Sequence, residues 1–379
     1  MSLLQIRLCV GAILLSNIVI NIATGMTSVL FPVTLEEKGL NTTFIGVILA
    51  MEFLAILPIS KWLVPIIGRI GMVKTLVVGS ALRVLAVMLF YEQNDMHVWG
   101  GLVFTYGVGS FIYLVALQSW INSLELKNNR GLVTGLFGTA ISAGVAIGPL
   151  FFQFIPVQGK LPFLISAGIS AAAAVPLIFV SIFSPKVPVK KTPKLWGIIK
   201  RAPAVMGAGV FIGVMLFGLW SFLVIYGLQN KLTAPEAAFL LTVFMTGSIL
   251  LETPIATISD RFDRRYIIII SVFLCLVCAT YLPIAIYTNY LSWALLFLWG
   301  GVSGSIYSMC LALIGERFAD EELVAANSAF SLMDAIGGMI GTALIGVSMS
   351  LFGADGLPYV IVLAGIVYFT YALTRYRVE

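Results

Sequence analysis

The sequence predicts an all-α polytopic membrane protein with twelve transmembrane helices, arranged as two pseudo-symmetric six-helix bundles. Three observations lead to this prediction. First, 60% of the 379 residues are hydrophobic and 10% are charged, and the mean hydropathy is +1.05; a soluble domain carries about 25% charged residues. Second, the chain contains repeated apolar segments of about 20 residues, the length that spans a bilayer. Third, its two halves repeat each other at a nearly constant offset.

The apolar segments are joined by short connections, except for residues 184–203, where 195–200 could form a short helix at the membrane interface. The first segment is too long for the hydrophobic core of a cleaved signal peptide, so we expect it to be a membrane helix. The predicted spans are 8–33, 43–66, 72–91, 98–121, 131–154, 161–183, 204–228, 235–258, 265–287, 291–314, 322–350 and 357–374.

The basic residues predict the orientation of these spans. Of the 22 Lys and Arg residues, Arg83 lies inside a span and Lys38, Lys160 and Lys231 fall on one side, which leaves 18 for the other side. Because the more positive loops stay in the cytoplasm, both termini are predicted to be cytoplasmic. The net charge of +5 is spread over short loops, so it does not indicate nucleic-acid binding.

The internal repeat predicts how the chain is divided. Shifting residues 39–72 by 192 places Leu40 on Leu232 and Arg69 on Arg261 without a gap. Parallel repeats of this kind predict two bundles related by an axis along the membrane normal. The predicted domains are an N-terminal six-helix bundle at 1–183, a cytoplasmic linker at 184–203 and a C-terminal six-helix bundle at 204–379.

A charged segment joins two of the apolar spans in the second half. Five of the six residues 260–265 are charged, so the segment must turn tightly at the membrane surface. Its pattern, Asp-Arg-x-x-Arg-Arg, resembles the cytoplasmic loop motif of the major facilitator superfamily, and with the repeat the resemblance covers essentially the whole chain. It implies a gating loop that comprises Asp260, Arg261, Arg264 and Arg265, with Arg69 in the corresponding loop of the first half.

In that family the acid of this motif faces the positive N-terminus of a helix in the other half and holds the cytoplasmic gate closed. The resemblance therefore implies a clamp between Asp260 and the fifth span. The corresponding position in the first half is Gly68, which would make the closed gate asymmetric. The alternative is that Gly68 is an incidental change.

The fifth span carries a second motif. Gly135, Gly144, Gly148 and Pro149 fit G-x8-G-x3-G-P, which resembles the motif of drug:proton antiporters. The family pattern ends with two further glycines, where this chain has Phe and Gln. Glycines four apart also let any two helices approach closely, so a packing role is expected for any substrate. At a shift of 193 the same glycine spacing recurs in the eleventh span, at Gly337 and Gly341.

Ionisable groups inside the spans are costly in hydrocarbon and are therefore candidates for function. Glu52, Arg83 and Asp334 each lie about ten to twelve residues into a span, near the midplane at about 1.5 Å per residue. Glu252 lies nearer the predicted cytoplasmic side. We predict proton or ion coupling through Asp334, Glu52, Glu252 and Arg83.

Asp334 has no obvious partner in the sequence, so it is the first candidate for coupling. In the family the second and eleventh spans meet, so Glu52 and Asp334 could share a cavity, and a cationic substrate could displace a proton from them. The alternative for Glu52 is a structural ion pair with Arg83. The alternative for Glu252 is packing at the gate. Val103 stands where many proton-coupled members have an arginine before Gly107, which excludes coupling through that arginine.

The substrate cavity is expected between the first, fourth, seventh and tenth spans, as the resemblance implies. Aromatic and neutral polar side chains there suit amphipathic molecules and cations, whereas the Arg or Lys cluster that anionic substrates need is absent from these spans. Some of these rings could pack against neighbouring helices instead. The predicted cavity residues are Asn17, Asn21, Thr24, Tyr106, Ser110, Tyr113, Gln118, Trp220, Trp299 and Tyr307.

The four cysteines all lie in apolar segments, including the pair Cys275 and Cys278. We interpret them as packing residues rather than a redox or metal site. No nucleotide-binding loop or Ser/His/Asp arrangement occurs, so we expect no enzymatic activity, cofactor or metal.

These observations predict a monomeric secondary transporter that works by alternating access in the lipid bilayer. Its most favoured activity is proton-coupled efflux of lipophilic or cationic small molecules. One alternative is uptake or facilitated exchange of a specific metabolite. An alternative of another class is a membrane receptor or lipid-handling factor that transports nothing.

Overall fold

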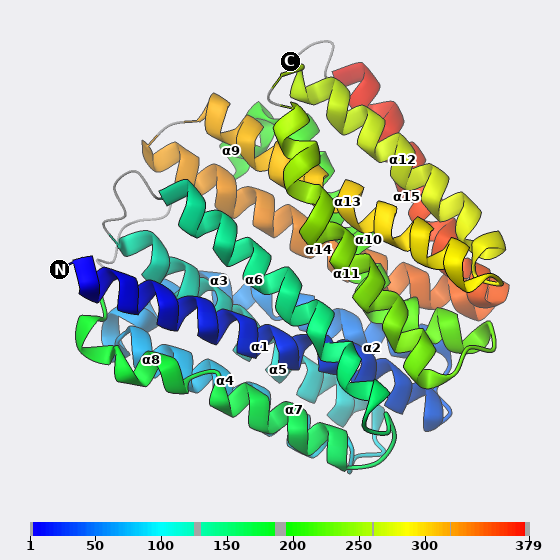
Figure 1. Cartoon of the computed structure of the whole chain (residues 1–379), viewed down its shortest axis with the longest axis horizontal. Helices are drawn as coiled ribbons and strands as arrows, with labels where there is room; N and C mark the ends of the chain where they lie inside the picture. Colours follow the sequence, from blue (N-terminus) through cyan, green and yellow to red (C-terminus); the bar gives the residue numbers. More distant parts are fainter. Residues whose placement is uncertain (1–2, 125–129, 186–194, 260, 319, 376–379) are drawn as a thin grey trace. The chain divides into compact units, whose positions relative to one another are not determined.

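The structure, a computed structural model of the full chain, describes residues 3–124, 130–185, 195–259, 261–318 and 320–375 (Figure 1). These residues form helices and no strand. The longer helices are α1 (Leu3–Glu37), α2 (Thr42–Leu54), α3 (Ile56–Ile70), α4 (Met72–Phe90), α5 (Met96–Ser123), α6 (Arg130–Leu150), α7 (Leu161–Ala172), α10 (Pro203–Gln229), α11 (Ala234–Ser259), α12 (Arg264–Ala285), α13 (Asn289–Arg317), α14 (Asp320–Phe352) and α15 (Gly356–Arg375). The shorter helices are α8 (Val175–Phe179), α9 (Leu195–Arg201) and the 3-10 turns η2 (Phe151–Gln153), η3 (Ser181–Phe183) and η4 (Gly353–Asp355).

The predicted fold class is confirmed. Eleven stretches of the described residues are long and apolar enough to cross a membrane. The last of them, Ala325–Arg375, contains both α14 and α15, which the turn η4 separates, so all twelve predicted spans are present. Helix α9 coincides with the short helix predicted at 195–200.

Two predicted spans are interrupted, and proline explains both breaks. The second span divides into α2 and α3 next to Ala55, and the sixth divides into α7 and α8 after Ala172. Pro58 and Pro176 each follow the last residue of the first helix by four positions. A proline lacks the N–H that would bond the carbonyl four residues earlier, and its ring crowds that carbonyl, so the helix ends there.

By its contacts the chain divides into two compact units. Unit 1 comprises Met1–Thr34 and Met51–Lys190, and unit 2 comprises Leu35–Ala50 and Lys191–Glu379. The first half of α2 groups with unit 2 because Gly46 packs against α14, where an added Cβ would lie 2.7 Å from the Thr342 carbonyl oxygen. The predicted domain boundaries at 183 and 203 stay a prediction.

In unit 1, α1 and α6 lie side by side (Figure 1). A Cβ added to Gly144 would lie 2.6 Å from the Ile18 carbonyl oxygen, and one added to Gly148 would lie 2.5 Å from the Ile22 carbonyl oxygen. Only glycine permits this approach, since real Cβ atoms need more than about 3 Å. Gly135, by contrast, has nothing within 4 Å of its Cβ position.

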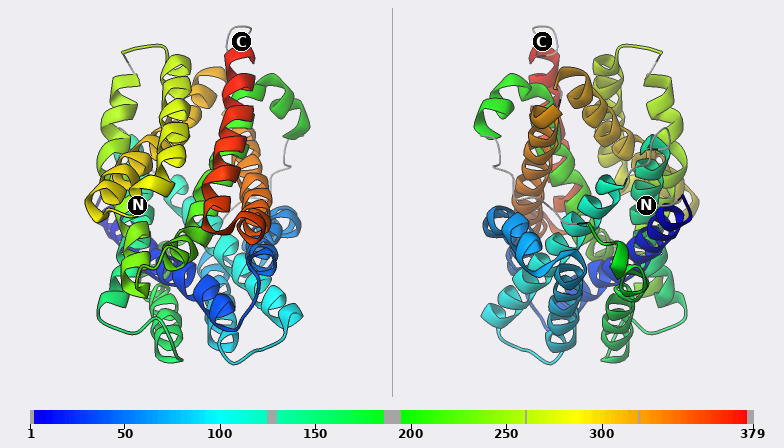
Figure 2. Two further views of the ribbon diagram at one scale, coloured as in Figure 1. Left: turned by 90° about the vertical axis from the view of Figure 1, so that its right-hand side faces the viewer. Right: turned by 90° about the vertical axis from the view of Figure 1, so that its left-hand side faces the viewer.

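Unit 2 repeats the same packing between α10 and α14. A Cβ added to Gly337 would collide with the Val210 carbonyl oxygen, and one added to Gly341 would lie 2.5 Å from the Val214 Cα atom. These pairs match those of unit 1 at shifts of 192 and 193, so the repeat in the sequence is also a repeat of contacts. Helix α15 packs against both α14 and α10 (Figure 2).

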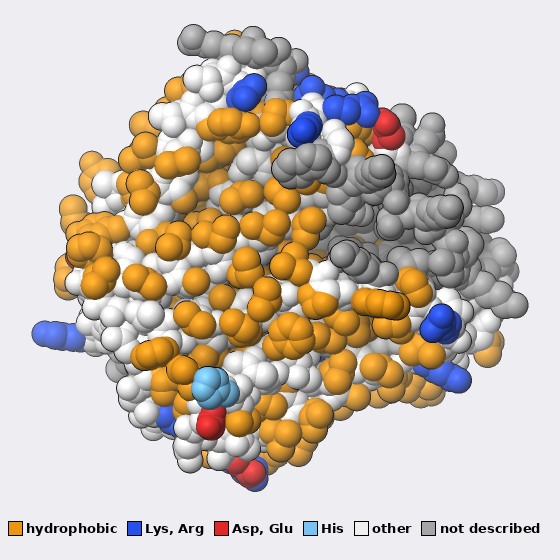
Figure 3. All heavy atoms as spheres, turned by 180° about the vertical axis from the view of Figure 1, so that it is seen from behind, with side chains coloured by type: hydrophobic (Ala, Val, Ile, Leu, Met, Phe, Trp, Pro, Cys, Tyr) orange, Lys and Arg blue, Asp and Glu red, His pale blue; other side chains and the backbone are white. Residues whose placement is uncertain are grey.

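The surface agrees with a membrane environment. Large hydrophobic side chains are exposed along many helices, including Leu85 (51%) in α4, Leu250 (56%) in α11 and Leu363 (64%) in α15. On the face drawn in Figure 3 hydrophobic side chains predominate, and charged side chains form a few small groups. Such a surface is stable against lipid tails and would aggregate in water.

We expect Gly148→Ala and Gly341→Ala each to lower the free energy of unfolding by about 1–3 kcal/mol, because the added methyl group overpacks a backbone contact. Gly135→Ala is the matched control and should change it by no more than about 1 kcal/mol, in the stabilising direction, because alanine favours the helix. Thermal unfolding of the purified protein in detergent measures both effects. Equal unfolding temperatures for all three variants would contradict the packing argument.

Candidate functional site

The buried guanidinium of Arg83 is the centre of a polar cluster inside unit 1. Arg83 is 3% exposed. Its Nη2 donates to the Tyr106 hydroxyl (2.8 Å), the Thr24 hydroxyl (2.9 Å) and the Ile20 carbonyl oxygen (3.2 Å). Its Nη1 donates to the Ser110 hydroxyl at 3.2 Å. The cluster therefore joins α4 to α1 and α5, and neutral oxygens rather than a carboxylate accept from the two Nη atoms, while the buried Nε atom has no partner in the described part of the chain.

Glu52 lies near this cluster but is not bonded to it. The charges of Glu52 and Arg83 act on each other through space, yet no ion pair joins them among the described residues. Glu52 is placed by backbone packing, because Gly107 of α5 lies directly against its carbonyl group. A carboxylate close to a cation and not bonded to it can change its protonation without breaking a salt bridge.

The other predicted polar residues of unit 1 bond mainly to neighbouring helices. The Asn17 side chain donates to the Phe137 carbonyl oxygen of α6 at 2.8 Å and accepts from Asn21 at 3.0 Å. Tyr113 shares a hydrogen bond of 2.6 Å with Ser16. Asn17, Tyr106 and Tyr113 are each 1% exposed, whereas Asn21 and Ser110 are partly buried and Gln118 is exposed. Their role in a substrate cavity stays a prediction.

Asp334 is a partly buried acid of unit 2. Its Oδ1 atom is buried and has no hydrogen-bond partner in the described part of the chain. The residue is held in place by Gly213 of α10, because a Cβ on that glycine would collide with the Asp334 carbonyl oxygen. The Tyr307 hydroxyl of α13 interacts with both Asp334 and Ser331. Asp334 therefore forms no ion pair with a cationic side chain among the described residues, and its charge acts on the hydroxyl of a partly buried tyrosine.

Asn327 is a second polar residue of α14 with a buried, unpartnered atom in the described part of the chain. It was not among the predicted residues. Its Oδ1 atom is also buried and unpartnered within the described ranges. Seven residues separate it from Asp334, which is two helical turns and places both side chains on the same face, about 10 Å apart. The i, i+7 spacing of two polar residues in an apolar span was the signal available in the sequence.

Glu252 has a different environment. It accepts a hydrogen bond from Ser248 one turn earlier (3.2 Å) and from Ser308 of α13, and the α13 backbone at Gly304 packs against its carboxylate. The carboxylate thus bridges α11 and α13 through hydroxyl groups. The two serines were not predicted, although Ser248 lies at the i−4 position where a helical partner is expected.

The three predicted aromatic residues of unit 2 differ in exposure. Trp299 is fully buried, and its Nε1 donates to the Met215 sulfur at 3.2 Å. Trp220 is partly buried, and its Nε1 has no partner among the residues that the structure describes. Tyr307 is partly buried, with its ring 5.2 Å from that of Phe330. Trp220 and Tyr307 keep an accessible edge, which a substrate needs.

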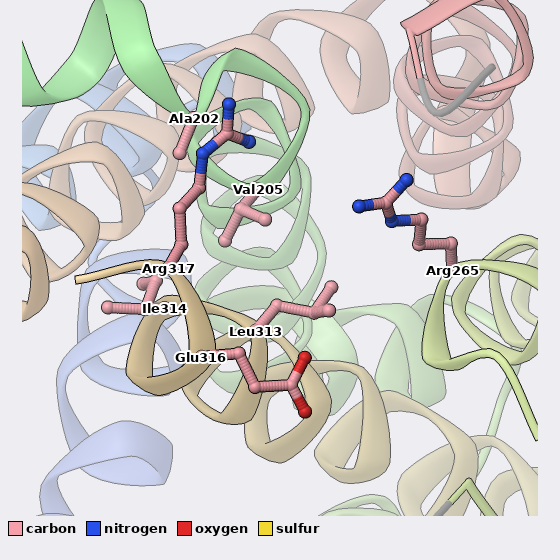
Figure 4. Close-up of a pocket in the computed structure, with 7 residues that line it drawn as sticks. All are labelled: Ala202, Val205, Arg265, Leu313, Ile314, Glu316 and Arg317. Carbon is pink, nitrogen blue, oxygen red and sulfur yellow. The ribbon is translucent and has the colours of Figure 1, made fainter. Parts of the chain in front are cut away.

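The residues of the charged loop after α11 make several different contacts. Asp263 caps α12 by accepting from the Arg265 backbone N–H at 2.9 Å. Arg264 forms an ion pair with Glu316 of α13, and Arg265 lines a pocket nearby (Figure 4). Arg261 is exposed, as is Arg69 in the last turn of α3. Asp260 lies outside the described residues, and so does its predicted clamp.

The comparisons with known sequences agree with this architecture. The profile described as Major Facilitator Superfamily matches residues 13–232 and 205–379. The chain is 25% identical over 342 residues to "Uncharacterized MFS-type transporter YfkF" of Bacillus subtilis (strain 168), covering 86% of this chain and 83% of YfkF. It is 23% identical over 370 residues to "Uncharacterized MFS-type transporter YcaD" of Escherichia fergusonii, covering 96% of this chain and 94% of YcaD.

Solved structures show the same fold at low sequence identity. The nucleoside transporter NupG superposes with a TM-score of 0.77 at 11% identity, over 97% of this chain and 99% of NupG. A bacterial homologue of the human lysosomal transporter Spinster superposes with a TM-score of 0.73 at 13% identity, over 98% of this chain and 96% of the homologue. At these identities the likeness extends to the fold alone.

We expect Arg83→Gln to lower the free energy of unfolding by about 2–3 kcal/mol, because a neutral amide cannot replace the charge-assisted bonds to α1 and α5. Arg83→Lys should fall between Gln and wild type, since its ammonium reaches fewer acceptors than a guanidinium. Thermal unfolding in detergent gives the comparison. The exposed Arg69→Gln is the matched control, and a loss there as large as in Arg83→Gln would contradict the assignment.

Proposed function

The chain belongs to the major facilitator superfamily, and on that premise we propose that it exports lipophilic cations in exchange for protons by alternating access. The observation that carries the proposal is the environment of Asp334. A partly buried carboxylate whose buried Oδ1 atom has no hydrogen-bond partner in the described part of the chain is costly when ionised. Either a proton or a bound organic cation removes that cost, and the two therefore compete for one site.

The charges inside the two units favour a cation over an anion as the substrate. Arg83 is a cation near the middle of a span, and four oxygen atoms from Ile20, Thr24, Tyr106 and Ser110 accept bonds from its Nη atoms, while its buried Nε has no partner in the described part of the chain. Asp334 leaves a carboxylate oxygen without a described partner, and its charge acts through space on the Tyr307 hydroxyl. An acid combined with an aromatic face is the chemistry that binds organic cations.

The membrane in which the protein lies and the side of its termini are also part of the proposal. The excess of Lys and Arg in alternate loops supports cytoplasmic termini, and the matched relatives come from bacteria. We therefore assign the chain to a bacterial inner membrane, as a monomer. The glycines at 144 and 148 pack α6 on α1, a role that would serve a drug:proton antiporter and any other close helix pair alike.

Transport into proteoliposomes tests the proposal. With an imposed pH gradient, wild-type protein should drive uptake of tetraphenylphosphonium or ethidium against its concentration gradient. Asp334→Asn should reduce the gradient-driven rate at least about tenfold, which corresponds to raising the transport barrier by about 1.4 kcal/mol. Substrate exchange without a pH gradient should persist, though with weaker substrate binding, because the amide keeps the shape of the side chain but carries no proton.

Glu236→Gln is the matched control, since it removes one carboxylate from the first turn of α11 far along the chain from Asp334. It should transport at the wild-type rate. Gradient-driven transport that is intact in Asp334→Asn would refute the assigned coupling residue. Transport of a single neutral metabolite with no effect of the pH gradient would favour facilitated exchange instead.

A further inference from the structure

Helix α14 has two accessible faces, and they differ in polarity. One is apolar, with Ile340 (42%) and Leu351 (70%) exposed, as expected of a side that lipid covers. The other is at Ser331, which is also exposed. Ser331 lies about two and a half turns before Ile340, at about 3.6 residues per turn, so the two residues are on opposite sides of the helix. An exposed serine opposite the lipid side indicates a face of α14 that small polar molecules can reach.

Asn327 and Asp334 lie on either side of Ser331, one turn before it and one turn after it. Residues at these spacings are neighbours on a helix surface, so the three form one polar face of α14. Asn327 and Asp334 are partly buried, and the Oδ1 atom of each is buried without a hydrogen-bond partner among the described residues. Thr342 also has such an atom, but it is fully buried where its backbone packs against Gly46, so it is not accessible.

The middle of the polar face differs from its two ends. The Ser331 side chain interacts with the Tyr307 hydroxyl of α13, and the Tyr307 ring lies 5.2 Å from that of Phe330. The polar face therefore has an unpartnered acceptor from the described residues at each end, and an aromatic surface with an occupied hydroxyl between them. A ligand that matches it carries a hydrogen-bond donor at each end and an apolar section in the middle.

The two ends also differ in charge. The Asp334 carboxylate can hold an ammonium group, whereas the Asn327 amide is neutral. A second ammonium at Asn327 would lose its water for an amide that carries no balancing charge, which is costly. A hydroxyl or an amide N–H satisfies the Asn327 oxygen without that cost. The second donor of a matching ligand is therefore neutral.

We propose that Asn327 is a substrate-binding residue that selects elongated monocations with a neutral hydroxyl or amide N–H about 10 Å from the cationic centre, the distance that two helical turns impose. This inference rests on the proposed function and narrows its substrate class. Asp334 binds the cationic centre, the hydrocarbon lies along Tyr307, and the neutral donor bonds to Asn327 Oδ1. Asn327 thus discriminates between cations that all use Asp334.

Isothermal titration calorimetry of the purified full-length protein in detergent tests the inference. The probes are an amino-octanol with its two groups at opposite ends of the chain, and the methyl ether of that alcohol, which keeps the oxygen but lacks the O–H donor. We expect the wild type to bind the alcohol about tenfold more tightly, because the ether leaves the Asn327 oxygen unpaired, and Asn327→Leu to bind both about equally. Comparing the ratio of the two affinities between variants cancels the uptake of each probe into micelles.

Two further variants sharpen the test. Asn327→Asp should bind the octanediamine of the same length more tightly than the wild type does, because a second carboxylate balances the second ammonium. Thr280→Val is the matched control, since the exposed Thr280 hydroxyl donates to the Leu276 carbonyl oxygen of its own helix, α12. It should keep the wild-type ratio of affinities. Thermal unfolding without ligand establishes that each variant is folded, and Asn327→Leu should be as stable as the wild type, because it removes an unpaired acceptor.

Equal affinities of the wild type for the alcohol and the ether would overturn the inference, as would a preference for the alcohol that persists in Asn327→Leu. Asp334→Asn separates this outcome from a failure of the proposed function. It should weaken the binding of both probes to the same extent and keep their ratio. Unchanged affinity for both probes in Asp334→Asn would contradict the cation site, while the preference for the alcohol would still support the role of Asn327. Binding of neither probe to the wild type would contradict both.

Discussion

Close approach of helix backbones at glycine positions is the constraint on which the rest of this structure depends. In lipid, apolar side chains gain little by leaving one hydrocarbon environment for another, so helices associate through close packing and hydrogen bonds. Gly144 and Gly148 bring α6 onto α1, and Gly337 and Gly341 bring α14 onto α10. The second of these contacts also determines where Asp334 lies, since Gly213 packs on its backbone. The scaffold and the proposed coupling residue therefore rest on the same contact.

The two units share their packing and differ in their charges. A shift of 192 places Arg83 on Cys275, and a shift of 193 places Ile141 on Asp334. Each buried charge is thus present in one unit and replaced by an apolar or weakly polar residue in the other. The Nη atoms of Arg83 donate to neutral oxygens within unit 1, and Arg83 Nε and Asp334 Oδ1 are both buried without a partner among the described residues. The symmetric part of the molecule builds the helix pairs, and the asymmetric part carries the chemistry.

The sequence predicted the twelve spans and the repeat because both depend on hydrophobicity and spacing, which are visible along the chain. It did not predict the side-chain partners. A span that is apolar on all sides has no hydrophobic periodicity, so its sequence does not indicate which way an aromatic ring points. The full burial of Trp299 against Met215 could therefore not be predicted. The four acceptors of Arg83 come from two other helices and require their packing to be known. Pro58, four residues after Leu54, was a signal in the sequence for the break near Ala55.

Proton release on substrate binding tests the central claim most directly. Purified protein in weakly buffered detergent solution is mixed with tetraphenylphosphonium at pH values between 6 and 8 while a pH indicator dye records released protons. The account predicts that cation binding releases up to one proton per protein at the pH where Asp334 is protonated, and none from Asp334→Asn. Saturable cation binding with no proton release at any of these pH values, or equal release from the variant, would contradict it.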